Sequence, residues 1–82
     1  MTLSEALVSA SKFGVTFAQE DLLLHLLRDG GRYIPVRLRG APLSGLVEAG
    51  LVVRVARRDA AIEYTLTEQG SSLARDIAEE YQ

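Results

Sequence analysis

The chain has 82 residues, which is enough for one compact domain and too few for two. It carries nine basic and eleven acidic side chains, a formal net charge of −2, and no cysteine. The lack of cysteine excludes disulfides, thiolate metal ligands and a cysteine nucleophile. No apolar run approaches the roughly 18 residues of a membrane span, and the first residues lack the pattern of a secretory signal. We therefore expect a cytoplasmic protein that makes no membrane contact.

The charges are distributed unevenly along the sequence. Residues 28–58 hold seven arginines against two acidic groups, a net charge of +5, whereas residues 1–27 carry −2 and residues 59–82 carry −5. A weakly acidic protein can therefore still present one basic surface, which favours a polyanionic partner. The alternative is that these arginines are scattered, solvated charges that contribute little to the stability of the fold. The seven are Arg28, Arg32, Arg37, Arg39, Arg54, Arg57 and Arg58.

Two capping boxes predict the starts of two helices. Residues 2–5 read Thr-x-x-Glu and residues 16–19 read Thr-x-x-Gln, so in each box the two side chains can satisfy each other's free backbone N–H groups. The first helix is expected over residues 1–14. The second is expected to end at Gly30-Gly31, because glycine commonly terminates a helix.

The second helix has two apolar faces. A helix that is apolar on two sides is covered on both, here by the first helix or by a second copy of the chain. Together with the short apolar helices at both ends of the chain, this predicts a homodimer formed through the terminal helices, with twofold symmetry. One face holds Leu22, Leu23, Leu26 and Leu27, and the other holds Phe17 and Leu24.

A short extended segment, one helical turn and a third helix are expected between residues 32 and 50. Residues 32–35 are expected to be extended, because the residue before Pro35 disfavours a helical conformation. Residues 36–39 fit a single helical turn. A proline suits the first turn of the next helix, over about residues 42–49, and Gly50 suits its C-terminal cap. The side chains expected to face the core are Leu43, Leu46 and Val47.

A hairpin is predicted over residues 51–66, because apolar and other residues alternate on both sides of a short polar connection. Tyr64 is expected on the inward face with Ile62 and Leu66. Thr67 is suited to cap a last helix over residues 67–82. The sequence therefore predicts one α+β, mostly helical domain over residues 1–82.

Two motifs bracket the predicted hairpin. Residues 43–52 read LSGLVEAGLV, and residues 64–70 read YTLTEQG. At this separation they resemble the winged-helix transcriptional regulators of the MarR and PadR type, over residues 17–75. The resemblance implies a winged helix-turn-helix fold with additional N- and C-terminal helices, in which residues 42–49 form the recognition helix and the hairpin forms the wing.

The resemblance implies a small DNA-binding regulator. Its recognition helix would approach the major groove with Ser44, Gly45 and Glu48 outward, and its wing would contact the DNA backbone. The short recognition helix and Glu48, which opposes a polyanion, leave a protein-interaction module without DNA binding as the alternative. The candidate DNA-contacting residues are Arg37, Arg39, Ser44, Arg54, Arg57 and Arg58.

Catalytic and metal-binding patterns are missing from the sequence. His25 is the single histidine, so it has no second histidine or cysteine with which to hold a metal, and we expect it to have a packing or partly exposed role. The serines lack a histidine at suggestive spacing, which argues against a hydrolase triad. We therefore expect no enzyme activity, no cofactor and no metal.

Overall fold

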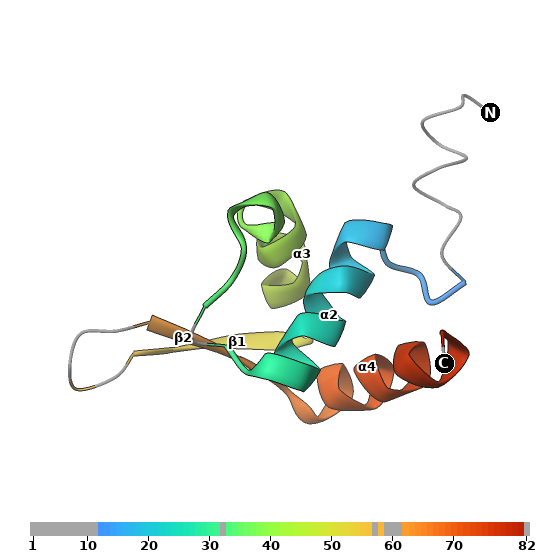
Figure 1. The fold of residues 1–82 in the computed structure, drawn as a ribbon. Coiled ribbons are helices and arrows are strands. Elements are labelled where there is room, and N and C mark those ends of the chain that lie inside the picture. The colour runs from blue at the N-terminus through green and yellow to red at the C-terminus, as the bar shows by residue number, and fades with distance from the viewer. Residues whose placement is uncertain (1–11, 32, 57, 59–61, 82) are drawn as a thin grey trace.

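The computed structural model describes residues 12–31, 33–56, 58 and 62–81. These residues form an α+β, mostly helical structure with three α-helices and a two-stranded antiparallel hairpin (Figure 1). In chain order the elements are α2 (Phe17–Asp29), the 3₁₀ turn η1 (Val36–Leu38), α3 (Ala41–Glu48), β1 (Val52–Ala56), β2 (Ile62–Leu66) and α4 (Glu68–Glu80).

The predicted boundaries agree with these elements to within one or two residues, except at the N-terminus. The helix predicted over residues 1–14 falls mainly on residues 1–11, which lie outside the described residues. Residues 12–14 form a turn and a bend, so the prediction that the helix reaches Gly14 is wrong. Of the segment expected to be extended, residues 33–35 belong to no strand, and residue 32 lies outside the described residues.

Local signals set both ends of α2. The Thr16 hydroxyl oxygen accepts from the Gln19 backbone N–H at 3.1 Å, and the Gln19 side-chain oxygen accepts from the Thr16 N–H at 2.9 Å. This confirms the predicted capping box. Gly30 ends the helix with a φ of +77°, a backbone conformation that favours glycine.

The core lies where α2 packs against α3 and α4 (Figure 1). Leu46 of α3 is completely buried, as predicted. Leu27 and Val47 were also expected inside, but they are 36% and 38% exposed. The helices are short and each turns only a narrow stripe toward the core, so residues at the margin of a stripe stay partly in solvent. The buried apolar residues are Leu22, Leu23, Leu26, Ile34, Leu38, Leu43, Leu46, Val52, Ala74 and Ile77.

The hairpin register decides which side chains face the helices. Arg54 pairs with Tyr64 and Val52 pairs with Leu66, and side chains two positions apart share one face of a strand. Because Val52 is buried in the core, Arg54 and Tyr64 lie on the same, inner face. Val53, on the other face, is substantially exposed.

The two motifs that flank the hairpin meet in a single junction at its base. The Thr67 N–H donates to the Leu51 carbonyl at 3.0 Å, and the Thr67 hydroxyl donates to the Gly50 carbonyl at 2.7 Å. The same hydroxyl oxygen accepts from the Gly70 N–H at 3.1 Å, which caps α4 as predicted. A Cβ at Gly70 would collide with the Leu51 carbonyl group. The junction therefore fixes where the hairpin leaves the helices.

A second close approach ties β2 to the end of α2. The Tyr64 N–H donates to the Gly31 carbonyl at 3.1 Å, and a Cβ at Gly31 would overlap the Tyr64 backbone. Gly30-Gly31 was interpreted as a helix stop, but only Gly30 has that role. Gly31 instead allows the loop to lie directly on the hairpin.

Candidate functional site

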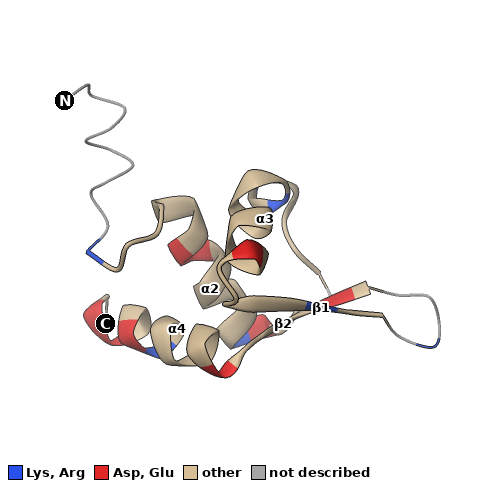
Figure 2. Ribbon diagram, turned by 180° about the vertical axis from the view of Figure 1, so that it is seen from behind, with Lys and Arg blue, Asp and Glu red and all other residues tan. Residues whose placement is uncertain are grey.

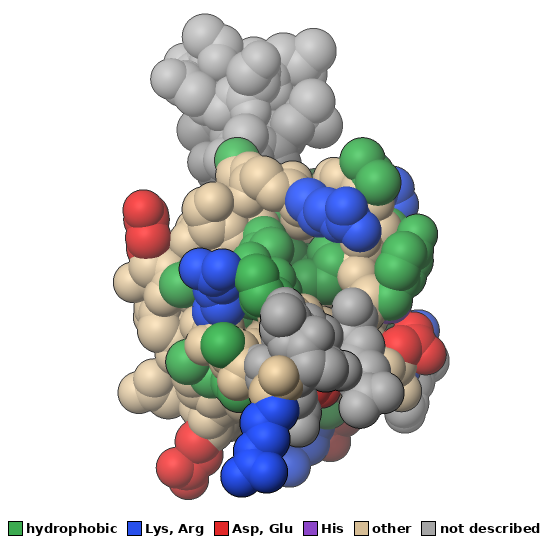
Figure 3. Space-filling model, turned by 90° about the vertical axis from the view of Figure 1, so that its left-hand side faces the viewer, with side chains coloured by type: hydrophobic (Ala, Val, Ile, Leu, Met, Phe, Trp, Pro, Cys, Tyr) green, Lys and Arg blue, Asp and Glu red, His purple; other side chains and the backbone are tan. Residues whose placement is uncertain are grey.

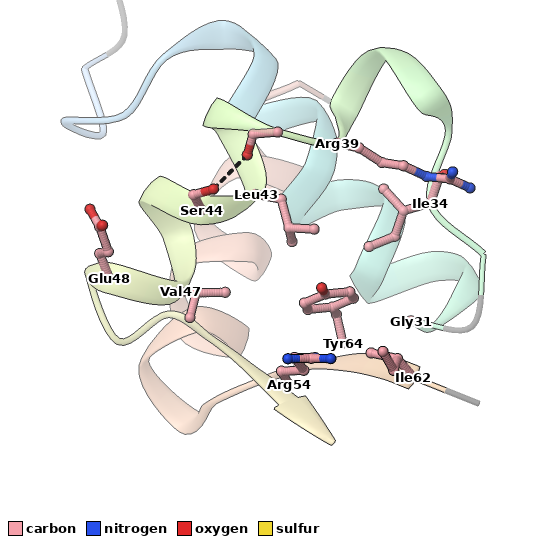
Figure 4. A pocket seen from close by; sticks show the side chains of 11 residues that line it. Gly31, Ile34, Arg39, Leu43, Ser44, Val47, Glu48, Arg54, Ile62 and Tyr64 are labelled. Atoms are coloured by element: carbon pink, nitrogen blue, oxygen red, sulfur yellow. Dashed lines mark hydrogen bonds between the residues drawn. The ribbon is translucent and has the colours of Figure 1, made fainter. Parts of the chain in front are cut away.

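A groove lies between α3, the loop before it and the inner face of the hairpin, with a volume of about 600 Å³ (Figure 4). We call it the α3–hairpin groove. Its apolar walls come from Ile34 in the loop, Leu43 and Val47 in α3, and Ile62 and Tyr64 in β2. Figure 3 shows hydrophobic side chains in this hollow with basic side chains around it.

Arg54 brings a positive charge into the groove. It projects from β1 beside Tyr64, its partner across the hairpin (Figure 4). The Arg54 side chain makes no hydrogen bond or ion pair with any residue that the structure describes. The Tyr64 hydroxyl, which points between Leu43 and Ile34, has no hydrogen-bond partner within the same part of the chain. A cation and a hydroxyl donor are therefore available at one side of the groove.

Arg39 lies at the opposite rim and is held in place by the loop. Its Nε–H donates to the Ile34 carbonyl at 2.9 Å, and its guanidinium carbon lies 6.0 Å from the centre of the Tyr33 ring. These contacts fix the direction of the side chain and leave the terminal nitrogens without a described partner. The charge of Arg39 is thus positioned and not neutralised by a carboxylate.

Arg37 is separated from Arg39, although the sequence places them two residues apart. It lies on η1, and its terminal nitrogen is 3.5 Å from a carboxylate oxygen of Asp21 in α2. Both side chains are largely exposed, so this ion pair contributes little to stability. Arg37 does not line the α3–hairpin groove, and its charge is partly compensated.

The exposed side of α3 offers few groups that could read DNA bases. The Ser44 hydroxyl donates to the Gly40 carbonyl at 2.9 Å, so its proton is already used. Gly45, expected to face outward, is half-buried against Gln19. Glu48 is exposed at the end of α3 and points away from the groove (Figure 4).

Acidic residues are most numerous on α4, and further acidic residues lie on α2, α3 and β2 among the basic ones (Figure 2). Arg58 is exposed at the tip of the hairpin, beyond the last paired residues; Arg57, also predicted at the tip, is outside the described residues. The C-terminal helix α4 has a negative surface, with Arg75 as its single basic residue. Its acidic residues are Glu68, Asp76, Glu79 and Glu80. The groove and the hairpin thus form the more basic side.

His25 anchors the loop that forms one wall of the groove. Its Nε2–H donates to the Tyr33 carbonyl at 2.6 Å, since a carbonyl can only accept, and its Nδ1 lies 3.4 Å from the Asp29 carboxylate. This agrees with the expected packing role. Within the described residues no cluster of three or more histidine or acidic side chains could hold a metal ion.

Comparison with protein-family models, curated proteins and solved structures finds no match for this chain. In the part of the chain that the structure describes, no helix has both the length and the apolar character needed to cross a membrane. The order of the described elements, with a hairpin directly after α3 and a helix directly after the hairpin, is compatible with a winged-helix-like arrangement.

Proposed function

We propose that this chain is a winged-helix domain that binds duplex DNA, with α3 as the recognition helix and the hairpin as the wing. The observation that carries the proposal is the placement of Arg39, Arg54 and Arg58. All three lie around the α3–hairpin groove or at the hairpin tip, and none has a carboxylate partner within the described residues. A set of uncompensated arginines on one side of an acidic protein suits a polyanion.

The proposed binding mode depends on phosphate contacts more than on base contacts. The exposed side chains along α3 are Ala41, Ser44, Val47 and Glu48, and together they offer no free donor of the kind that arginine or asparagine presents to a base edge. Arginines that contact phosphates add affinity without sequence information. We therefore expect modest discrimination between DNA sequences.

An electrophoretic mobility assay with mixed genomic duplex fragments, across a series of salt concentrations, tests this proposal. Retarded complexes at low salt that dissociate as salt is raised support it, because phosphate contacts release counterions. The absence of any complex at low salt refutes it.

The alternative function is a protein-interaction module, and the apolar walls of the groove favour it. Ile34, Leu43, Val47, Ile62 and Tyr64 form a concave surface of the kind that accepts a partner's apolar side chains. A chain that fails to bind duplex DNA at low salt would leave this interpretation as the preferred one.

We further propose that the protein forms a twofold homodimer through its terminal helices. Phe17 at the start of α2 is 46% exposed, and Tyr81 after the end of α4 is 59% exposed. Both lie at one end of the molecule, because the Tyr81 hydroxyl donates to the Glu20 carboxylate, one turn along α2 from Phe17. Two exposed aromatic side chains at one end suit an interface between copies, and a dimer would double the number of phosphate contacts.

A further inference from the structure

We propose that the free edge of β1, the side of the strand away from β2, binds an extended segment of a partner protein as an added antiparallel strand. Acidic side chains of that segment would lie beside Arg54, and β-branched side chains beside Val53 and Val55. This binding does not rest on the proposed DNA-binding function.

The backbone of β1 presents hydrogen-bonding groups on the side away from β2. Bonded and non-bonded residue pairs alternate along an antiparallel hairpin. The carbonyl of Leu51, just before β1, accepts from the N–H of Thr67 opposite it, so the next bonded pair along the strand contains Val53. Arg54 and Ala56 occupy the alternate positions, and their N–H and C=O groups therefore point outward.

The far side of β2 gives independent support for this alternation. Tyr64 is paired with Arg54, and the Tyr64 N–H donates to the Gly31 carbonyl instead of to β1. This is the direction expected for a non-bonded pair, in which both residues turn their backbone groups away from each other. Within the described residues no backbone hydrogen bond reaches the outward groups of Arg54 and Ala56.

The edge lacks the usual protection against strand pairing. Natural sheets protect a free edge with proline, lysine, a bulge or a covering segment. The sequence of β1 is VVRVA, and the strand pairs residue for residue with β2, without a bulge. Every residue of β1 after Val52 is exposed, so the described part of the chain leaves this edge open.

The side chains on the two faces of β1 define the chemistry of the partner segment. On the outer face Val53 and Val55 are 45% and 37% exposed, and β-branched side chains on an added strand would cover them. Glu63, opposite Val55 on the same face, disfavours a further acidic side chain there. On the inner face the Arg54 side chain has no carboxylate partner among the described residues, so an acidic side chain opposite it would form a favourable cross-strand pair. The segment therefore alternates apolar and acidic residues.

A second copy of the chain suits this edge less well than a segment of another protein. The antiparallel register that overlaps two copies of β1 completely, over residues 52–56, places one Arg54 directly opposite the other. Like charges in that position destabilise a strand pair. Pairing between copies is therefore the competing outcome in the test.

The test is an NMR titration of the full, ¹⁵N-labelled chain with a blocked peptide of sequence TVEVEVT. We expect saturable shifts in β1 and slower hydrogen exchange at the N–H groups of Arg54 and Ala56, which would bond to the added strand. The N–H groups of Val53 and Val55 already bond to β2, so their exchange should slow less. The absence of shifts in β1, or shifts confined to α4, would overturn the proposal. Protection of Arg54 and Ala56 without peptide, increasing with protein concentration, would overturn it in favour of a second copy.

Control peptides separate the backbone contribution from the charge contribution. Opposite residues in an antiparallel pair share a face, so the two glutamates of the peptide would bond to the edge of β1. N-methylation of these glutamates should weaken binding about tenfold or more, as the loss of two hydrogen bonds implies, whereas N-methylation of two valines should weaken it much less. The neutral peptide TVQVQVT should bind up to about fivefold more weakly than TVEVEVT. Equal affinities within either comparison would refute the proposed mode.

Variants of β1 locate the site on the protein. Ala56→Pro removes an outward N–H group and no bond to β2, which an edge strand tolerates, and should weaken peptide binding by about tenfold. Ala56→Ser keeps that group and should bind like wild type. Arg54→Gln should abolish the preference for TVEVEVT over TVQVQVT, whereas Arg75→Gln, the same charge change on exposed α4, should leave it intact. The NMR spectrum reports whether each variant is folded, and wild-type affinity in folded Ala56→Pro would refute the assigned edge.

The same variants separate this proposal from the proposed DNA binding. Ala56→Pro keeps every arginine, so it should retard duplex DNA as wild type does while its peptide binding is lost. Peptide binding by a protein that never retards duplex DNA would support the edge site and refute the DNA-binding function. DNA binding without peptide binding would do the reverse.

Discussion

Replacing Gly70 with alanine tests the junction that joins the hairpin to α4. In a helix, alanine is normally favoured over glycine by about 1 kcal/mol. Here the added Cβ would collide with the Leu51 carbonyl oxygen and lie 2.9 Å from the carbonyl carbon. The backbone of Leu51 cannot move away without disturbing the hydrogen bond that its carbonyl accepts from the Thr67 N–H.

The magnitude follows from three contributions. Overpacking a well-packed site costs about 1–3 kcal/mol, and each hydrogen bond weakened at Thr67 costs about 1 kcal/mol. After the gain in helix propensity, we expect Gly70→Ala to lower the free energy of unfolding by about 2 kcal/mol. For a domain of this size that corresponds to a fall in Tm of about 8–16 °C.

The assay is thermal and urea denaturation of Gly70→Ala beside two control variants. At Gly45 the close neighbours of an added Cβ among the described residues belong to the Gln19 side chain, with Nε2 at 2.6 Å. Moving that amide would weaken the bond that its Oε1 accepts from the Thr16 N–H, a cost of about 1 kcal/mol. The gain in helix propensity offsets this cost, so Gly45→Ala should change stability by less than about 1 kcal/mol. Ser72→Ala, at an exposed position of α4, measures a gain in helix propensity, smaller than that of glycine to alanine, without a buried contact. A Gly70→Ala protein as stable as these controls would refute the proposed close contact.

Three further predictions concern the core, the C-terminus and the oligomeric state. Leu46→Ala should destabilise the protein by about 2–5 kcal/mol, since Leu46 is fully buried; an unchanged urea midpoint would contradict its placement. Partial desolvation and the nearby Glu20 carboxylate raise the pKa of Tyr81 above its ordinary value of 10.0. The neutral phenol is therefore favoured in the folded state, so its stabilising contribution is complete below pH 10 and is lost as the pH rises through the folded-state pKa. Tyr81→Phe should lessen the fall in stability above pH 10, and identical pH profiles would count against this coupling. Phe17→Ser should shift sedimentation toward monomer at high micromolar concentration, whereas a wild-type protein that is already monomeric there would exclude the proposed dimer.

Local sequence signals predicted the element boundaries well. The box at Thr16 and Gln19, the glycines at positions 30 and 50, and the cap at Thr67 act through backbone groups a few residues away. Such interactions can be inferred from spacing alone. The burial of Leu46 followed in the same way from helical periodicity.

The groove could not be predicted from those signals, because long-range packing creates it. The strand around Arg54 has apolar residues in both of its alternating rows, so periodicity does not say which row faces α3. The buried Val52 decides this, and places Arg54 beside Tyr64. The separation of Arg37 from Arg39 also depends on a distant residue, Asp21 in α2.

The contact glycines were missed for a related reason. Gly31 and Gly70 are required by backbone segments that are far away in sequence. Gly70 is the last residue of one of the two motifs that carry the resemblance, but its contact with Leu51 could be seen only in three dimensions.

The central claim is that the basic side of the molecule binds DNA phosphates, and the salt dependence of affinity tests it most directly. The measurement is the slope of log affinity against log salt for wild type, for Arg54→Gln/Arg58→Gln, and for Arg28→Gln/Arg75→Gln, which makes the same charge change outside the groove. Each lost phosphate contact flattens the slope by about 0.9. We predict a slope flatter by about 1.8 for the first pair and little change for the second. Equal slopes for the two pairs, at equal thermal stability, would contradict the account.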